Sequence, residues 1–151
     1  MPRLARTLLA FAALPGVVAF AIPAALAAAL APPARAAAAA GLFVGGLGLA
    51  GLLGCVRDFH IAGLGTLAPW WPATRLVTIG LYRRSRNPMY LCVVTILLGW
   101  TIAFQALPLA LYAAGVAVAF HLRVVFGEEP WLRRTMGPAW ADYAARVPRW
   151  L

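Results

Sequence analysis

Lysine is absent from this chain of 151 residues, and acidic residues are scarce: four carboxylates stand against 13 arginines, giving a formal net charge of +9. Charged residues make up only 11% of the chain and hydrophobic residues 64%, a balance too apolar for a soluble domain. The composition therefore predicts an integral membrane protein. Its positive charge indicates contact with the anionic surface of a lipid bilayer rather than with nucleic acid.

Cysteines and metal-ligand clusters are also few. Cys55 and Cys92 both lie in apolar segments, which argues against a disulfide framework or a zinc site and favours a role as small buried hydrophobes. The glycine tract at 63–65 follows no strand and opens no clear helix, so the sequence does not predict a dinucleotide-binding turn. No spacing of side chains predicts a metal site.

Long apolar runs, in contrast, account for most of the chain. The expected fold is one membrane-embedded, all-α domain with about four transmembrane helices and a cytoplasmic, amphipathic helical segment at the C-terminus. The four spans are expected at about 7–31, 36–56, 88–104 and 107–126, with a cytoplasmic loop at 57–87 and a cytoplasmic tail at 127–151.

Two details qualify the first two spans. Pro15 and Pro23 interrupt the first span and predict a kink or a broken helix, although a cleaved signal peptide is an alternative reading of the basic start and the small residues that follow. The second span is rich in glycine, which predicts close packing against another helix. Glycines four residues apart are expected by chance in such a segment, so they predict no dimer.

The distribution of arginine predicts the topology. If the N-terminus is cytoplasmic, every arginine except Arg35 and Arg123 falls in a cytoplasmic segment, and Arg123 lies near the cytoplasmic end of the last span. The positive-inside rule then predicts a multi-pass protein of the cell membrane with both termini in the cytoplasm.

A cationic turn leads directly into the third span. Asn87 is a suitable N-cap and Pro88 a suitable first helical residue. The free N–H groups of that helix end, together with the arginines at 83, 84 and 86, would hold an anionic group. Basic residues beside a membrane helix are also ordinary topology signals, so the turn alone leaves both readings open.

A short turn at 105–108 predicts that the third and fourth spans form a hairpin. Glu128 and Glu129 would then emerge beside Asn87, Pro88 and Tyr90. Such a pocket suits a zwitterionic ligand, because a glutamate can pair with an ammonium group or accept from ribose hydroxyls, and the tyrosine can face a sulfonium or an adenine. The glutamates could equally serve only to neutralise the arginines.

His121 precedes Glu128 by seven residues, which predicts the same helix face two turns deeper. Ionisable groups within a membrane helix are functional candidates, so His121 and Glu128 are the candidate catalytic residues for handling a proton. A neutral packing histidine is the alternative interpretation.

Several motifs together resemble the isoprenylcysteine carboxyl methyltransferase and phospholipid methyltransferase superfamily. They are Gly65-Thr66-x-x-Pro69, Leu76-Val77-x-x-Gly80-Leu81-Tyr82, Arg86-Asn87-Pro88-Met89-Tyr90, Gly99, Glu128-Glu129-Pro130-x-Leu132, Gly137 and Val147-Pro148-Arg149-Trp150. The resemblance covers roughly residues 65–151. It implies a membrane methyltransferase that uses S-adenosylmethionine and a lipophilic acceptor, either an isoprenylcysteine-like carboxylate or a phospholipid amine. The cofactor-binding residues it implies are Arg86, Pro88, Tyr90, Glu128 and Glu129, and we add Asn87, whose amide can form hydrogen bonds with the cofactor.

This chain departs from the superfamily at three positions. Asn87 stands where many members have histidine, Cys92 where glycine is frequent, and Trp140 where tyrosine is found. Asn87 can still form hydrogen bonds but cannot act as a base.

Two other classes of protein remain as alternatives. One is a non-enzymatic membrane scaffold or carrier. The other is a related membrane reductase whose nicotinamide cofactor would place its phosphates on the arginines.

Overall fold

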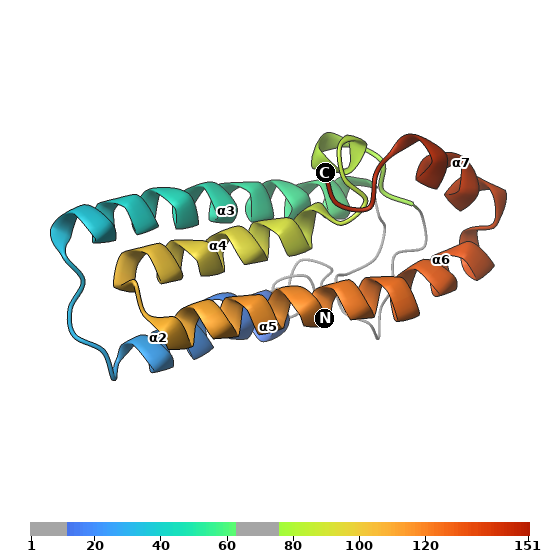
Figure 1. Cartoon of the computed structure of the whole chain (residues 1–151). Helices are drawn as coiled ribbons and strands as arrows, with labels where there is room; N and C mark the ends of the chain where they lie inside the picture. The colour runs from blue at the N-terminus through green and yellow to red at the C-terminus, as the bar shows by residue number, and fades with distance from the viewer. Residues whose placement is uncertain (1–11, 63–75) are drawn as a thin grey trace.

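The computed structural model describes residues 12–62 and 76–151, and every regular element in these two ranges is helical, as the composition predicted. Figure 1 shows α3, α4 and α5 side by side, with α6 continuing the line of α5 and α7 at the end of the bundle where α3 finishes. The elements are η1 (Ala12–Ala21), α2 (Ile22–Ala27), α3 (Arg35–Ala62), η2 (Gly80–Arg83), α4 (Pro88–Phe104), α5 (Leu107–Arg123), η3 (Val124–Glu128), α6 (Glu129–Met136) and α7 (Pro138–Arg146).

Two of these helices are long and apolar enough to cross a membrane. They are α3 and the continuous helix Leu107–Met136, which joins α5, η3 and α6. The apolar helices Pro15–Ala27 and Pro88–Phe104 are shorter. At a rise of about 1.5 Å per residue, the 17 residues of α4 extend roughly 25 Å, somewhat less than the ~30 Å hydrocarbon core. A bundle of four spans therefore stays a prediction.

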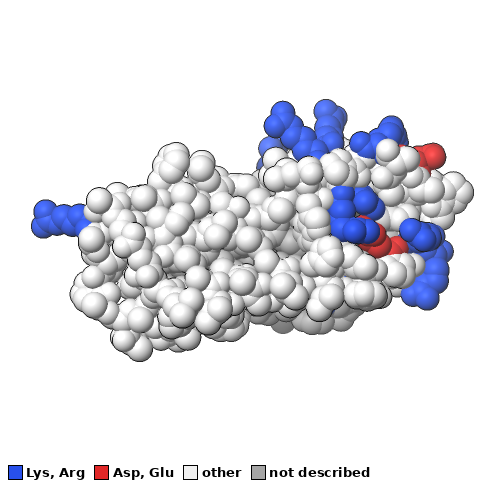
Figure 2. Space-filling model, viewed as in Figure 1, with Lys and Arg blue, Asp and Glu red and all other residues white. Residues whose placement is uncertain are grey.

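The charged side chains gather at one end of the molecule. Figure 2 shows this end on one face, with a long uncharged surface beside it and a single basic residue at the opposite end. Arg35 begins α3 at that opposite end. This distribution fits a bundle whose uncharged length lies in lipid.

The helix bounds differ from the sequence expectation in three places. The fourth span was expected to end at residue 126, but its helix continues through η3 and α6 to Met136. The second span was expected to end at residue 56, but α3 continues through Arg57, Asp58 and His60 to Ala62. A polar residue marks the exit from the hydrocarbon but does not stop a helix, so α3 runs on at headgroup level and the loop is shorter than 57–87. The first helical segment ends at Ala27 rather than at residue 31.

Glycines bring α3 and α4 into close contact, as expected. A Cβ atom added to Gly48 would lie 2.8 Å from the Cys92 carbonyl oxygen and from the Ile96 nitrogen, both in the backbone of α4. A Cβ atom on Gly99 of α4 would lie 2.7 Å from the Gly41 carbonyl oxygen. Only glycine permits such an approach, and the resulting dispersion contacts hold helices together in lipid.

The first helical segment changes from the π-helix η1 to the α-helix α2 next to Pro23, and its backbone stays helical across the junction rather than breaking. Pro23 follows this change and has no N–H group to donate. In the preceding turn, the Val18 carbonyl accepts a hydrogen bond from Tyr112 Oη at 2.9 Å, and the Ala19 carbonyl accepts one from Trp100 Nε1 at 3.0 Å. These bonds matter because an unsatisfied carbonyl in lipid is costly. They attach η1 to α4 and α5.

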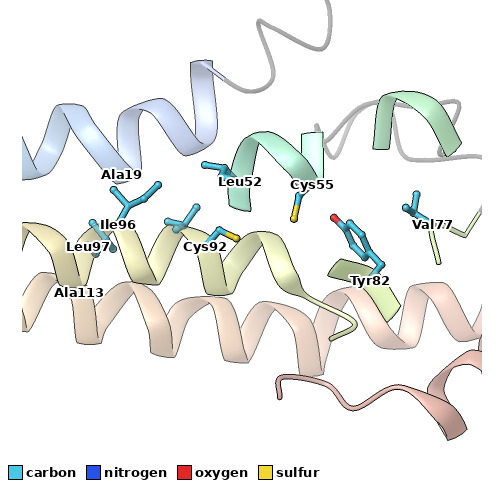
Figure 3. Packing of buried hydrophobic residues seen from close by; sticks show 10 residues of the cluster. Ala19, Leu52, Cys55, Val77, Tyr82, Cys92, Ile96, Leu97 and Ala113 are labelled. Atoms are coloured by element: carbon cyan, nitrogen blue, oxygen red, sulfur yellow. The ribbon is translucent and has the colours of Figure 1, made fainter. Parts of the chain in front are cut away.

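Buried side chains form two clusters. The larger one lies between α3 and α4 and extends to η1 and α5; Figure 3 shows Leu52, Ile96 and Leu97 within it. The smaller one contains Trp140, Tyr143 and Val147, which recur at helical spacing in the sequence. It packs α7 over the polar end of the bundle. Gly137, with φ of 53°, separates α6 from α7.

Candidate functional site

The site lies where the α4–α5 hairpin returns to the charged end. Gln105 adopts a left-handed conformation (φ 49°) at the end of α4, and its N–H donates to the Thr101 carbonyl at 2.8 Å. The helix α5 then runs back beside α4. Tyr90 Oη consequently donates a short hydrogen bond to Glu128, and Arg123 Nε donates to the Glu128 carboxylate at 2.8 Å. The predicted approach of Glu128 to Tyr90 is confirmed.

The π-turn η3 separates the functions of the two adjacent glutamates. A π-turn places an extra residue in the helix and rotates everything that follows relative to α5. Glu128 ends η3 and contacts Tyr90 and Arg123, whereas Glu129 begins α6 and contacts Arg86 and Arg149. The two carboxylates therefore belong to two different sets of contacts.

Glu129 is the centre of a buried ionic cluster. Its carboxylate lies 3.0 Å from Arg86 Nη1 and accepts two hydrogen bonds of 2.8 Å from Arg149 Nε and Nη2. The residue is only 8% exposed, so its charge depends on these partners for compensation. The hydrogen bonds to Glu129 raise the pKa of Arg149 above its usual value.

The C-terminal residues bind back onto the cationic turn. The Arg86 N–H donates to the Pro148 carbonyl at 2.9 Å, and Asn87 Nδ2 donates to the Arg149 carbonyl at 3.0 Å. Ser85 Oγ also donates to the Arg149 carbonyl, at 3.3 Å, and accepts the Asn87 N–H at 3.1 Å. Asn87 is the N-cap residue of α4, as predicted, but its side chain makes no capping hydrogen bond and instead donates to the C-terminal segment.

A cavity of about 940 Å³ opens between this turn, α5 and α7. Its polar lining includes Arg86, Asn87, Tyr90, Arg123, Glu128 and Arg134. Its apolar part comes from η1, α3, α4 and α5 and includes Val18, Leu52, Phe59, Met89, Val93 and Phe120. Small-molecule sites have volumes of roughly 300–1,000 Å³, so this cavity is at the large end of that range and suits a ligand with a polar and an apolar portion.

Arg86 is held firmly at the cavity wall. Its guanidinium carbon lies 5.5 Å from the centre of the Trp140 ring, a cation–π contact, and Nη1 pairs with Glu129. Arg86 Nε is buried and has no hydrogen-bond partner among the described residues. A buried donor without a partner is costly, so this nitrogen is suited to donating to an anionic ligand.

Three of the predicted site residues do not line the cavity. Pro88 begins α4, as predicted, and Glu129 belongs to the ionic cluster. His121 is exposed on the outside of α5, where it accepts a hydrogen bond of 3.3 Å from Trp150 Nε1. It was expected on the face of Glu128, but η3 lies between the two residues and changes the helical period that the expectation assumed.

Sequence reasoning missed two groups that shape the site. Arg149 was noticed only as part of a motif, since nothing local indicated that the C-terminus folds back onto Glu129. Tyr143 was assigned only to an amphipathic face, yet its Oη donates to the Tyr82 carbonyl at 2.7 Å. Burial raises the pKa of Tyr143 to about 12, so it remains a protonated donor that fixes α7 on η2.

The described residues form an all-helical bundle with two candidate membrane-spanning helices and a ligand-sized cavity where its apolar part meets its charged end. A family model described as phospholipid methyltransferase matches residues 36–139, and the chain belongs to this family, within the isoprenylcysteine and phospholipid methyltransferase superfamily. The matched range contains the cationic turn and both glutamates but not Arg149. The family indicates a membrane methyltransferase. No curated protein and no solved structure matches the chain.

Proposed function

We propose that this protein transfers the methyl group of S-adenosylmethionine to a lipophilic acceptor in the membrane. The observation that carries the proposal is the cavity itself, which combines Arg86, Tyr90 and Glu128 at one end with a long apolar wall. Family membership supports the reaction class.

The residues present fit the cofactor. Arg86 can donate to the carboxylate of the methionine portion through its unpartnered Nε. Glu128 can accept from the ammonium group or from ribose hydroxyls, and the rings of Tyr90 and Trp140 offer faces for a sulfonium or an adenine. Asn87 supplies a further polar group at the wall. In this proposal Pro88 and Glu129 act indirectly: one begins α4 and the other holds Arg86.

The apolar wall favours an acceptor with a hydrocarbon portion. Val18 of η1 and Phe120 of α5 both line the cavity, and the helical stretches 15–27 and 107–120 that contain them carry no charged residue. An isoprenylcysteine-like carboxylate and a phospholipid amine both match this wall. The two acceptors differ in whether a proton must be removed before methylation.

S-adenosylmethionine, when bound, supplies an electrophilic methyl carbon. The chain's contribution would be to align the acceptor and exclude water, which suffices for a carboxylate because it is already ionised. An amine must first lose a proton. Glu128 can take up this proton, because among the described residues it is the only carboxylate that lines the cavity. His121 lies outside the cavity. Of the two candidate catalytic residues, Glu128 is the one retained.

The test is calorimetric titration of the detergent-purified protein with S-adenosylmethionine and S-adenosylhomocysteine. We expect saturable binding that Glu128→Gln weakens strongly, because glutamine keeps the shape and removes the charge. Asp142→Asn is the matched control, an exposed carboxylate on α7 at the same end of the molecule. Lack of binding to folded wild type would refute the proposal and favour a scaffold or carrier, and binding of a nicotinamide dinucleotide instead would favour a reductase.

A further inference from the structure

A second, smaller hollow lies outside the methyl-transfer cavity, at the junction of η3 and α6. This groove has a volume of about 390 Å³ and is lined by Val125, Glu129, Pro130, Arg133, Arg134 and Arg149. Arg134 also lines the large cavity, so the two sites share a wall.

The groove carries a net positive charge that the protein itself does not neutralise. Glu129 is its one carboxylate, and that group is already paired with Arg149 and with Arg86. Within the described ranges, Arg133 and Arg134 take part in no ion pair, and both are exposed. Arg149 has committed Nε and Nη2 to Glu129 and keeps its other nitrogen. Three guanidinium groups in one groove match the geometry and charge of a phosphate group.

The surroundings indicate that this phosphate belongs to a lipid. The groove lies at the end of the long uncharged surface, where the charged side chains begin (Figure 2). On α5, the helix that leads to the groove, Leu111 and Val118 are 63% and 58% exposed, which is the apolar surface an acyl chain requires.

We propose that this groove binds the phosphate of an anionic phospholipid, with the acyl chains along the outer face of α5. The bound lipid is distinct from the methyl acceptor, and the inference does not depend on the proposed methyltransferase activity. Because the groove includes Arg149 and Glu129, the lipid would lie directly against the cluster that holds Arg86 at the cavity wall.

The test is native mass spectrometry of the full chain in an uncharged detergent, titrated with phosphatidylglycerol and, separately, phosphatidylcholine. Three variants are compared with wild type: Arg133→Gln/Arg134→Gln, Arg133→Lys/Arg134→Lys, and a control, Arg83→Gln/Arg84→Gln. The control removes the same charge from exposed positions at the same end of the molecule, away from the groove.

A basic side chain near an anionic lipid surface contributes about 1 kcal/mol, and the groove glutamine variant removes two of them. This variant should therefore bind phosphatidylglycerol roughly 30-fold more weakly than wild type. The lysine variant keeps the charge but not the planar guanidinium, so its affinity should lie between those of wild type and the glutamine variant, and the control should change little. An equal loss of affinity for phosphatidylglycerol in the groove variant and the control would overturn the site, because it would mean that the overall positive charge, rather than this groove, attracts the lipid. Equal affinity for phosphatidylcholine, or full competition by millimolar inorganic phosphate, would overturn the assignment to an anionic lipid.

Discussion

Replacing Glu129 with glutamine should destabilise the protein far more than the same change at Glu128. Glu129 is 8% exposed. Without its negative charge, the guanidinium groups of Arg86 and Arg149 lose their shared partner, although their side chains are only 14% and 36% exposed. Breaking a buried pair by removing one partner costs about 3–5 kcal/mol. Because Arg149 is partly solvated, we expect a loss of about 2–3 kcal/mol in the free energy of unfolding for Glu129→Gln.

Glu128 is the matched comparison within the same helix. Its side chain is 34% exposed and that of its partner Arg123 is 49% exposed, so the pair is screened by water and should contribute at most about 1 kcal/mol. Thermal unfolding in detergent micelles should therefore give a Tm roughly 4–12 °C lower for Glu129→Gln and a smaller change for Glu128→Gln. Equal shifts, or a larger shift for Glu128→Gln, would refute the separation of the two glutamates into a structural and a ligand-facing role.

The packing of the bundle yields three further predictions, each measured as a change in Tm in the same detergent. Gly48→Ala should lower the Tm because its Cβ would lie 2.8 Å from backbone atoms of α4, whereas Gly46→Ala, with nothing within 4 Å, should leave it unchanged or raise it. Trp100→Phe should cost about 1–3 kcal/mol by leaving a carbonyl of η1 without its donor; no loss would mean that this carbonyl is satisfied otherwise. Tyr143→Phe should cost a similar amount, about 1–3 kcal/mol, because the buried Tyr82 carbonyl loses its partner, and unchanged stability would contradict that docking of α7.

Much of the framework follows from local chemistry and could be predicted from the sequence. Pro88 fixes the start of α4, and the short turn at Gln105 obliges α5 to return beside it. The break at Gly137 and the common face of Trp140 and Tyr143 likewise reflect backbone freedom and helical period. Each of these features depends on residues within one or two turns of one another, which is the range over which sequence patterns are informative.

The parts that could not be predicted depend on contacts between distant residues or on an irregular backbone. The return of Arg149 to Glu129 joins residues 20 apart across two helices, and no periodicity encodes it. The π-turn η3 has no sequence signature, yet it decides which glutamate faces the cavity and leaves His121 outside. The continuation of α3 beyond residue 56 was not predicted, because the polar residues Arg57 and Asp58 were interpreted as the start of a loop. Trp70 and Trp71, whose amphipathic rings predict a position at headgroup level, lie outside the described residues.

The most direct test of the account is transfer of a radiolabelled methyl group. Membranes containing the wild-type protein, incubated with S-adenosylmethionine labelled in its methyl group, should yield label in the organic extract, and membranes containing folded Glu128→Gln should yield much less. Base would release the label as volatile methanol if the acceptor is a carboxylate, because a methyl ester is hydrolysed, and would leave it non-volatile and bound to nitrogen if the acceptor is an amine. Extracts of wild-type membranes with no more label than membranes lacking the protein would contradict the proposed methyl transfer.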